Sequence, residues 1–370
     1  MINKNPTLIV DAGKIEYNAQ VITTLCQQHD NIQVAAVTKG VCAEPEIAEA
    51  MLRGGCTMLA DSRLENLERL RTQHFDVDYL LLRLPMISEA EETVRLADIS
   101  LNSEIETIKA LNSAAQKQQT THRIILMIDV GDLREGIWPE TIPAILPEIL
   151  QCEHIILEGI GCNLGCYGGV IPSPENMQLL LEQKRLIESS YSISIHLVSG
   201  GTSTTLQLLA SGKMPTGINH FRIGEAILLG RNPADRSPVP GTFQDTFILR
   251  GEIVECQWKP SVPIGQIGQD AFGHLPVFED RGIRLRAILA LGRQDIVVTG
   301  LTPCDPEVQI LGASSDHLIV DITDTQYSYK VGSTLSFFPN YAALLAASTS
   351  QYIRKICINC EHGIKKTEHT

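Results

Sequence analysis

The chain has 370 residues, of which 44% are hydrophobic, so it is long enough to bury a large core and to form two domains. Its formal net charge of −13 argues against nucleic acid or an anionic membrane surface as a partner. No apolar stretch is long enough to span a bilayer, and the amino terminus lacks the apolar core of a signal peptide. Ten cysteines without regular spacing indicate reduced thiols and a cytoplasmic location.

Eight apolar runs alternate with helical patterns over roughly the first 230 residues. We predict strands at Gln33–Lys39, Cys56–Asp61, Asp78–Arg83, Asp98–Asn102, Arg123–Val130, Ile155–Asn163, Ser194–Ser199 and Asn219–Ile223. Helical patterns between them include Glu44–Arg53, Leu64–Thr72, Glu89–Ala97, Glu104–Gln118, Thr141–Gln151, Glu175–Ser189 and Thr204–Ala210. This alternation predicts an α/β fold, with a parallel (β/α)8 barrel of the TIM type over residues 12–235. A doubly wound open sheet is the alternative, but it usually has fewer strands.

After Gly230 the sequence changes, with a Pro-rich stretch at 237–241 and then short runs rich in β-branched residues. The strands predicted here are Phe247–Cys256, Leu285–Leu291, Ile296–Thr299, Val308–Leu311, His317–Ile322 and Thr334–Phe338. They predict a smaller all-β domain over residues 236–358, which residues 5–11 join as an amino-terminal strand. Residues 359–370 are polar and are expected to form a disordered tail.

The predicted barrel strands have apolar bodies but polar ends. These ends carry Lys39, Asp61, Arg83, Asn102, Asp129, Asn163, Ser199 and Arg222. The active site of a (β/α)8 barrel lies where the strands end and the following loops begin. A lysine at a strand end is usually solvated. Polar groups at nearly every end instead favour a functional Lys39, an amine whose pKa is lowered by burial so that it attacks an aldehyde.

Two loops have the composition of an anion site. Ser199–Ser203 places glycines and small hydroxyls before a helix, where backbone amides and the helix dipole face an anion. Phe221–Ala226 repeats this at the eighth strand, and phosphate groups in such barrels sit beside the loops after strands seven and eight. A plain glycine-rich turn is the alternative for the first loop alone. Combined with Lys39, the two loops indicate pyridoxal 5′-phosphate.

Several motifs, spread over almost the whole chain, carry a resemblance to a known family. They are VTKGVCAE, LADSRLENL, LLRLPM, VGDLREG, SGGTSTT, RIGEAILLG, KPSVPIGQIGQDAFG and LGASSDHLIVDITD. With these motifs the chain resembles the fold-type III family of pyridoxal-phosphate enzymes that includes alanine racemase, and within it the ornithine racemase subgroup.

The resemblance implies that Lys39 holds pyridoxal 5′-phosphate and acts as one catalytic base, while Arg222 donates to the pyridine nitrogen. An arginine keeps its proton, so the ring nitrogen stays unprotonated. The weaker electron sink that results favours racemisation over side reactions. Asn163 stands where alanine racemase has a histidine near the ring, and this departure puts a stacking role in doubt.

Further cofactor contacts follow from the same resemblance. The residues concerned are Thr202, Ser203, Gly224, Glu225 and Tyr341. Glu225 is expected either to pair with Arg222 or to be solvated, and Tyr341 is alternatively an ordinary core tyrosine.

The resemblance also implies a substrate site. Arg134 resembles the arginine that supports the ring oxygen and the substrate carboxylate. Ser315 and Asp316 match carboxylate-side contacts offered in trans by the second domain. Asp316 could instead bind the distal ammonium of ornithine, or be a turn residue.

Racemisation through two bases requires an acid–base group on each face of the Cα. Where alanine racemase supplies a tyrosine from its partner subunit, Lys259–Leu289 contains none. Asp270 is the first candidate, because a desolvated carboxylate has a raised pKa, although a loop aspartate that caps a turn is the alternative. His274 and His317 are the other candidates, since histidine titrates near neutrality.

The sequence therefore predicts pyridoxal-phosphate-dependent racemisation of a free amino acid, with ornithine favoured, in a cytoplasmic homodimer with shared active sites. A racemase for alanine, serine or lysine is one alternative. A fold-type III decarboxylase is another, but there a glutamate meets the pyridine nitrogen. A non-catalytic pyridoxal-phosphate carrier would lack the second domain. No metal site is expected, because Cys357, Cys360 and His362 offer only three ligands near the end of the chain.

Overall fold

The computed structural model describes residues 6–359 and divides the chain into two compact units. Ala12–Gln244 form one unit, and Asp245–Asn359 form the other together with the residues up to Asp11. The sequence placed this boundary nine residues earlier, after residue 235. The boundary falls later because Phe243 binds the barrel unit: its amide donates to Asn18 Oδ1 at 2.7 Å, and Asn18 Nδ2 donates to its carbonyl at 2.9 Å.

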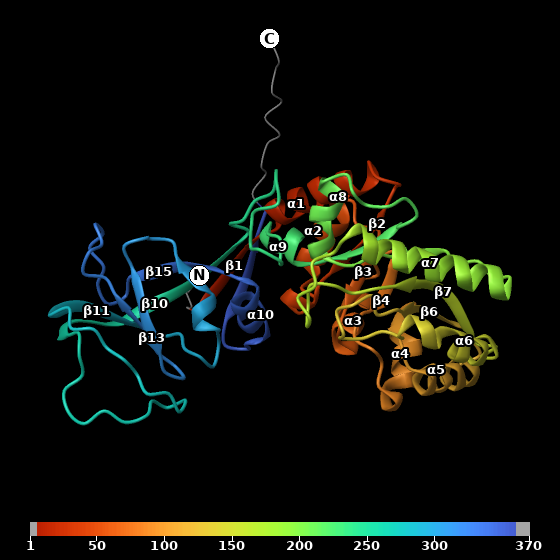
Figure 1. Ribbon diagram of the computed structural model, residues 1–370. Helices are drawn as coiled ribbons and strands as arrows, with labels where there is room; N and C mark the ends of the chain where they lie inside the picture. The colour runs from red at the N-terminus through yellow and green to blue at the C-terminus, as the bar shows by residue number, and fades with distance from the viewer. Residues whose placement is uncertain (1–5, 360–370) are drawn as a thin grey trace, which may run out of the picture. The chain divides into compact units, whose positions relative to one another are not determined.

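The first unit is a closed barrel of eight parallel strands, as predicted (Figure 1). The strands in barrel order are β2 (Gln33–Val37), β3 (Met58–Asp61), β4 (Asp78–Leu81), β5 (Ile99–Asn102), β6 (His122–Met127), β7 (Ile155–Gly161), β8 (Leu197–Ser199) and β9 (His220–Ile223). The barrel closes where β9 pairs with β2, with Ala35 opposite Arg222. All eight predicted strands are present, and the structure mainly shortens their ends.

Helices surround the barrel strands (Figure 1). They are α1 (Ala12–Gln27), α2 (Pro45–Arg53), α3 (Leu64–Arg71), α4 (Ala90–Leu96), α5 (Ile105–Lys117), α6 (Ile142–Leu150), α7 (Pro174–Tyr191), α8 (Leu206–Ala210) and α9 (Glu225–Leu229). The start of α7 shows how sequence sets an end: Ser173 and Asn176 form a reciprocal capping box, and Pro174 occupies the first helical position.

Apolar side chains fill the barrel interior along strands β2 to β6. The buried cluster consists of Ala35, Val37, Met58, Ala60, Leu80, Ile99, Leu101, Ile125 and Met127. On each strand these residues alternate with others, because successive side chains of a strand point to opposite faces. Burying each larger member contributes about 1.5–3 kcal/mol. The polar strand ends therefore lie above a packed apolar core.

The second unit is an eight-stranded, largely antiparallel sheet. Its strands are β1 (Thr7–Asp11), β10 (Phe247–Pro260), β11 (Ile283–Leu289), β12 (Leu301–Pro303), β13 (Gln309–Ala313), β14 (Leu318–Asp321), β15 (Thr334–Pro339) and β16 (Arg354–Ile358). The amino-terminal strand β1 pairs antiparallel with β10 and parallel with β16.

This sheet confirms the predicted β domain, with two differences in detail. The predicted strand Ile296–Thr299 instead leads into a 3-10 turn at Val298–Gly300. The unit is also not purely β, because α10 (Tyr341–Thr349) follows β15, with the Asn340 side chain accepting from the amide of Ala343 at 3.0 Å. The predicted disordered tail falls, after Asn359, outside the described residues.

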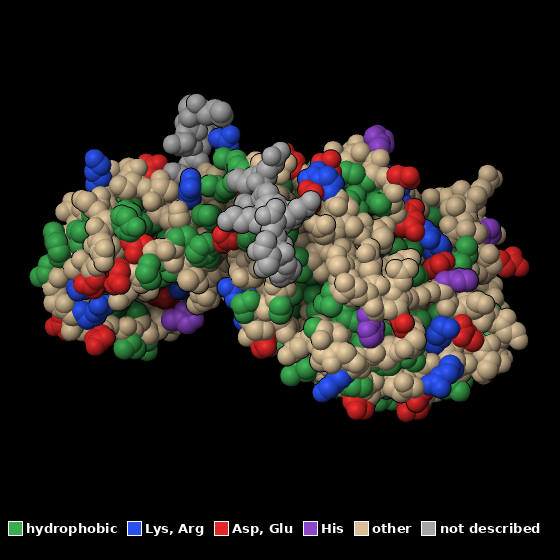
Figure 2. Space-filling view, turned by 90° about the horizontal axis from the view of Figure 1, so that it is seen from above, with side chains coloured by type: hydrophobic (Ala, Val, Ile, Leu, Met, Phe, Trp, Pro, Cys, Tyr) green, Lys and Arg blue, Asp and Glu red, His purple; other side chains and the backbone are tan. Residues whose placement is uncertain are grey.

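Figure 2 shows a face of the molecule on which acidic and basic side chains are interspersed. Within residues 6–359, none of the helices has the length and apolar character needed to cross a membrane. The same residues hold no group of His, Cys, Asp and Glu side chains arranged to bind a metal.

Candidate active site

Lys39 lies at the carboxyl end of β2, in the first position of a 3-10 turn at Lys39–Val41. Its side chain is half-buried, and burial is the main reason that the pKa of its amine lies below the usual range for lysine. Arg134 and Arg222 lower this pKa further, while Cys166 and Asp61 raise it. The functional interpretation of Lys39 gains support, because a solvated lysine would lack these neighbours.

Arg222 projects from β9 and is buried, with 3% of its surface exposed. Its guanidinium donates to the Ser199 hydroxyl and, at 2.8 Å, to the carbonyl of Cys162. Ser199 in turn bonds His220 Nδ1 at 2.8 Å, and burial lowers the pKa of His220 to about 3. Arg222 is thus a fixed cation held by neutral partners.

Asn163 follows β7 and is buried, with 5% of its surface exposed. Its side-chain Nδ2 has no hydrogen-bond partner among the described residues. A buried amide nitrogen without an acceptor is unfavourable by about 1–3 kcal/mol. Such an atom at a barrel mouth fits a site that a polar ligand completes.

The two predicted anion loops are joined to each other. Ser203 begins a 3-10 turn at Ser203–Thr205, and its hydroxyl accepts from the Ala226 amide in the first turn of α9 at 3.1 Å. The hydroxyl hydrogen of Ser203 therefore remains able to donate. Thr202 bonds the Thr204 hydroxyl at 3.1 Å, so the hydroxyls of this loop form a local network.

Gly224 is the residue that precedes α9, and a Cβ built there would lie 3.1 Å from the Cβ of Val37. The Ala226 amide bonds Ser203 and the Ile227 amide bonds the Gly224 carbonyl at 3.1 Å, so Gly224 and Glu225 supply the other amides at the start of α9 beside the Ser203 loop. The chemistry of this pair of loops fits a phosphate.

Glu225 neither pairs with Arg222 nor is solvated, so both interpretations from the sequence are wrong. Its carboxylate forms an ion pair with Arg236 at 2.6 Å rather than with Arg222. It is also not solvated, because only 11% of its side chain is exposed. Burial raises the pKa of Glu225, and Arg236 opposes that rise.

Arg134 lies in the loop after β6, where its guanidinium pairs with the adjacent Glu135. Asp132, in the same loop, is buried and accepts from the amides of Gly165, Tyr167 and Val170 at 3.1–3.2 Å. The loops after β6 and β7 are therefore tied together, and this tie fixes the segment that carries Cys166.

The remaining predicted site residues belong to the second unit, so their roles at the barrel mouth stay predictions. Tyr341 is the first residue of α10. Ser315 donates to Asp316 Oδ2 at 2.8 Å within the exposed turn between β13 and β14. Asp316 also accepts from Gln294 Nε2 at 3.3 Å.

The premise for Asp270 is wrong, because its carboxylate is not desolvated. Oδ1 accepts from the amides of Phe272 at 2.8 Å and His274 at 2.9 Å, and these bonds lower its pKa rather than raise it. Its contacts are those of a turn-capping aspartate. The His274 side chain lies in the same loop and is 71% exposed.

Sequence reasoning missed several partners at this site. The sequence predicts Ser199 and Asp61 only as strand ends, and nothing in it indicates that Ser199 accepts a hydrogen bond from Arg222. No sequence signal identified Cys166 or Glu135, because a single cysteine or a charged neighbour in a loop has no diagnostic pattern. Their proximity to Lys39 and Arg222 depends on how two loops fold over the strand ends.

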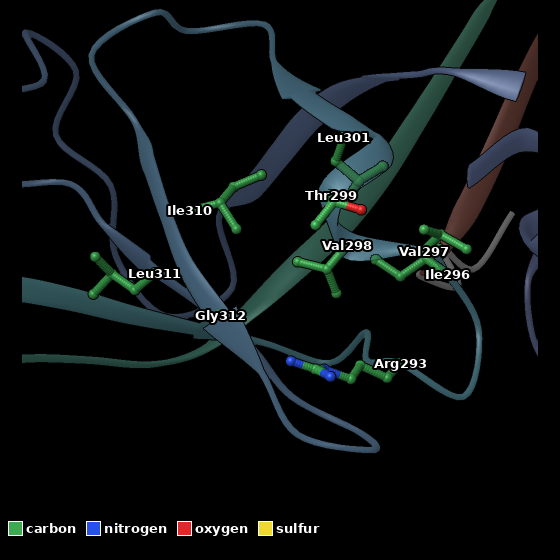
Figure 3. A pocket seen from close by; sticks show the side chains of 9 residues that line it. All are labelled: Arg293, Ile296, Val297, Val298, Thr299, Leu301, Ile310, Leu311 and Gly312. Carbon is green, nitrogen blue, oxygen red and sulfur yellow. The ribbon is translucent and has the colours of Figure 1, made fainter. Parts of the chain in front are cut away.

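An apolar cavity of about 630 Å³ lies in the second unit, beside β12 and β13 (Figure 3). Val298, Leu301 and Ile310 line it, and Arg293 stands at its edge (Figure 3). The Arg293 guanidinium lies 4.2 Å from the ring centre of Phe272. Thr299 and Arg293 are the polar residues of this lining, which contains no lysine, histidine, cysteine or carboxylate.

Comparison with known proteins agrees with this geometry. Residues 10–232 match the family described as alanine racemase, N-terminal domain. An ornithine racemase of Acetoanaerobium sticklandii is 44% identical to this chain, and the match covers 95% of this chain and 99% of the relative. A lysine racemase of Thermotoga maritima is 40% identical, and the match covers 95% of this chain and 98% of the relative. The chain belongs to the alanine racemase family.

A solved structure supports the fold of the whole chain. It is an alanine racemase from Bartonella henselae with covalently bound pyridoxal phosphate, which has a TM-score of 0.71 and 18% identity. The match covers 96% of this chain and all of the other. At this identity the likeness establishes the shared barrel and antiparallel sheet.

Proposed function

We propose that this chain is a pyridoxal-phosphate-dependent racemase of a free amino acid, with ornithine as the favoured substrate. The observation that carries the proposal is the half-buried Lys39 amine at the barrel mouth, with a lowered pKa and with Arg222 and Arg134 as neighbours. Relatives named ornithine racemase and lysine racemase support a diamino acid as substrate.

The barrel residues fit the cofactor. Arg222 offers a fixed donor for the pyridine nitrogen, and Asn163 has a buried donor without a partner. Ser203 and the amides at the start of α9, with Thr202, Gly224 and Glu225 beside them, suit the phosphate. When bound, pyridoxal 5′-phosphate supplies an electron sink that acidifies the Cα–H of the amino acid attached to it.

Lys39 acts on one face of the Cα. Its lowered pKa increases the fraction of unprotonated amine near neutrality, which suits removal of the Cα proton by Nζ. Arg222 keeps its own proton, so it holds the ring nitrogen without transferring a proton to it. Arg134 is proposed to bind the substrate carboxylate.

The opposite face requires a second acid–base group, which we propose comes from the second unit of a partner subunit. Asp270 and His274 are the proposed groups, and His274 is the preferred candidate of the two, because the lowered pKa of Asp270 makes that carboxylate a weaker base. Ser315 and Asp316 are proposed to reach the substrate, and Tyr341 the phosphate, from the same unit. This arrangement requires a homodimer with shared active sites.

The decarboxylase alternative has lost its support. A decarboxylase of this fold type needs a carboxylate at the pyridine nitrogen, and Glu225 is the carboxylate that follows β9 in the chain. Glu225 pairs with Arg236, while the buried charged residue on β9 is Arg222. We retain racemases for lysine, alanine or serine as the alternatives within the same chemistry.

A cytoplasmic location is also part of the proposal. The nine cysteines within residues 6–359 form no disulfide with one another. Burial raises the pKa of Cys26 and Cys162 to about 12 and holds both as thiols. Cysteines in this number without disulfides suit a reducing compartment.

Incubating the purified protein and pyridoxal 5′-phosphate with single L-amino acids in deuterated water tests the function. We expect ornithine to gain deuterium at Cα and to become racemic without releasing carbon dioxide. Lys39→Ala should abolish both changes, whereas Lys213→Ala, at an exposed lysine, should retain them. Release of carbon dioxide, or no exchange with any amino acid, would contradict the proposal.

Substrate choice has its own test. Asp316→Asn should raise KM for ornithine about tenfold and change KM for alanine little, because it removes one charge-assisted contact to the distal ammonium. Equal changes for both substrates would assign Asp316 to the carboxylate side or to the turn.

A further inference from the structure

Asp61 is a fully buried carboxylate at the end of β3, next to the turn that bears Lys39. Its Oδ2 accepts from the Thr38 hydroxyl at 2.7 Å. Thr38 is also fully buried and directly precedes Lys39. The carboxylate therefore contacts the side chain of the residue directly before Lys39, although it lies on a neighbouring strand.

Thr38 is the anchor of that turn. Its amide donates to the Ala60 carbonyl at 2.9 Å, and its own carbonyl accepts from the amides of Val41 at 3.0 Å and Ala43 at 3.2 Å. The hydroxyl bond to Asp61 adds a side-chain tie to these backbone bonds. Rotation of Thr38 would displace Lys39, since the two residues share a peptide bond.

Asp61 also contributes charge. The groups that act on the Lys39 amine are Cys166, Arg134, Asp61 and Arg222. Two of them are cations that oppose the ammonium form, and Asp61 is the carboxylate of the set. The charge of the Asp61 carboxylate favours the ammonium form of Lys39 and so offsets part of the effect of the two arginines.

The other carboxylate oxygen of Asp61, Oδ1, accepts hydrogen bonds from a different set of groups. Oδ1 accepts from the amides of Ser62 at 2.7 Å and Arg63 at 3.1 Å, and from Asn66 Nδ2 at 2.9 Å. These bonds hold the carboxylate against the start of α3. Asn66 therefore provides a matched control: it contacts the same carboxylate on the side away from Thr38.

We propose that Asp61, acting through Thr38, is a positioning residue that fixes the turn bearing Lys39 and keeps a negative charge near its amine. The inference rests on the proposed function, in which Lys39 holds the cofactor. It goes beyond that function by assigning the orientation and proton affinity of Lys39 to a residue that does not touch the substrate.

The first measurement is the titration of Lys39 in the full chain freed of cofactor. Reductive methylation at a series of pH values, read by mass spectrometry on the peptide containing Lys39, gives the pKa of this amine. Asp61→Asn keeps the shape and one acceptor but removes the charge, so we expect the proton affinity of Lys39 to fall about three- to tenfold. Asn66→Ala should leave it unchanged.

The second measurement is the dissociation constant of pyridoxal 5′-phosphate. Thr38→Val removes the hydroxyl but keeps the shape, and should weaken binding about tenfold, the size of one hydrogen bond to a charged group. Thr38→Ser should restore binding to within about twofold. Asn66→Ala should bind as the unchanged protein does.

The outcomes separate this inference from the proposed function. The positioning role is wrong if two results occur together, even where the unchanged protein racemises ornithine. The first is equal cofactor affinity in Thr38→Val and Thr38→Ser. The second is an equal pKa of Lys39 in Asp61→Asn and Asn66→Ala. If Asp61→Asn does not fold, the Thr38 pair decides alone. Loss of the proposed function would appear instead as Lys39→Ala binding cofactor and exchanging Cα protons normally.

Discussion

Arg222 is a buried cation, and within residues 6–359 its guanidinium donates to the Ser199 hydroxyl and the Cys162 carbonyl. Burial lowers its pKa, yet an arginine remains protonated in any protein environment. Desolvating a charge without a carboxylate partner is unfavourable for folding. A residue held in this way is expected to serve the reaction rather than stability.

We predict that Arg222→Lys lowers activity at least tenfold, because an ammonium cannot reproduce the planar donor geometry that reaches both Ser199 and Cys162. Loss of one of the two bonds should also lower the free energy of unfolding by about 1–2 kcal/mol. Racemisation rates and urea denaturation measure the two effects. Arg53→Lys, at an exposed ion pair, is the control and should change neither.

At the scale of elements, the short connection from β8 to α8 has to turn within a few residues. Gly201 has φ +123°, and a Cβ there would lie 2.4 Å from the Thr205 hydroxyl oxygen. Both conditions favour glycine, since a side chain would meet strain and a close contact at once. The same turn carries Thr202 and Ser203 toward α9, so its geometry sets the proposed phosphate site.

Gly201→Ala should therefore weaken cofactor binding at least tenfold and lower stability by about 1–3 kcal/mol. Gly212→Ala is a matched control: φ is +69° there, and nothing lies within 4 Å of the added Cβ. It should lower stability by about 1 kcal/mol and leave cofactor binding unchanged. Equal cofactor affinity in the two variants would show that the turn does not shape the phosphate site.

At the scale of the whole molecule, the barrel unit holds two buried histidines in their neutral form. Burial lowers the pKa of His220 to about 3 and that of His122 to about 4. Unfolding returns both to an ordinary value near 6.5. The unfolded chain then binds more protons than the folded chain between about pH 3 and pH 6.5, so stability falls as the pH falls through this range.

From pH 8 to pH 5, each of these histidines should remove about 2 kcal/mol from the free energy of unfolding. Urea denaturation of the full chain at the two pH values measures the loss. His122→Asn retains a polar side chain beside Ser100, which His122 Nε2 contacts at 2.8 Å. This variant should lose about 2 kcal/mol less than the unchanged protein over the same range. An identical loss in both proteins would mean that His122 does not titrate on unfolding as stated.

The sequence alone determined the succession of barrel strands and the place of Lys39. Strands buried on both faces must be continuous apolar runs, and polar residues must mark their ends, so β2 and Lys39 were visible from composition and order. The second unit was less predictable, because Ile296–Thr299 has a strand's composition but forms a loop and turn. Short runs lack the periodicity that would separate these states.

Only the tertiary structure decided which polar groups meet. Glu225 pairs with Arg236 because the chain after α9 turns back, and Arg222 reaches Ser199 because β8 and β9 are neighbours. Asp270 differs from these two residues, because its partners are local: the amides of Phe272 and His274 in the same loop lower its pKa, as the turn-capping interpretation implies. Strand burial is a local property of consecutive residues, whereas the partners of Glu225 and Arg222 are set by how the chain folds back on itself.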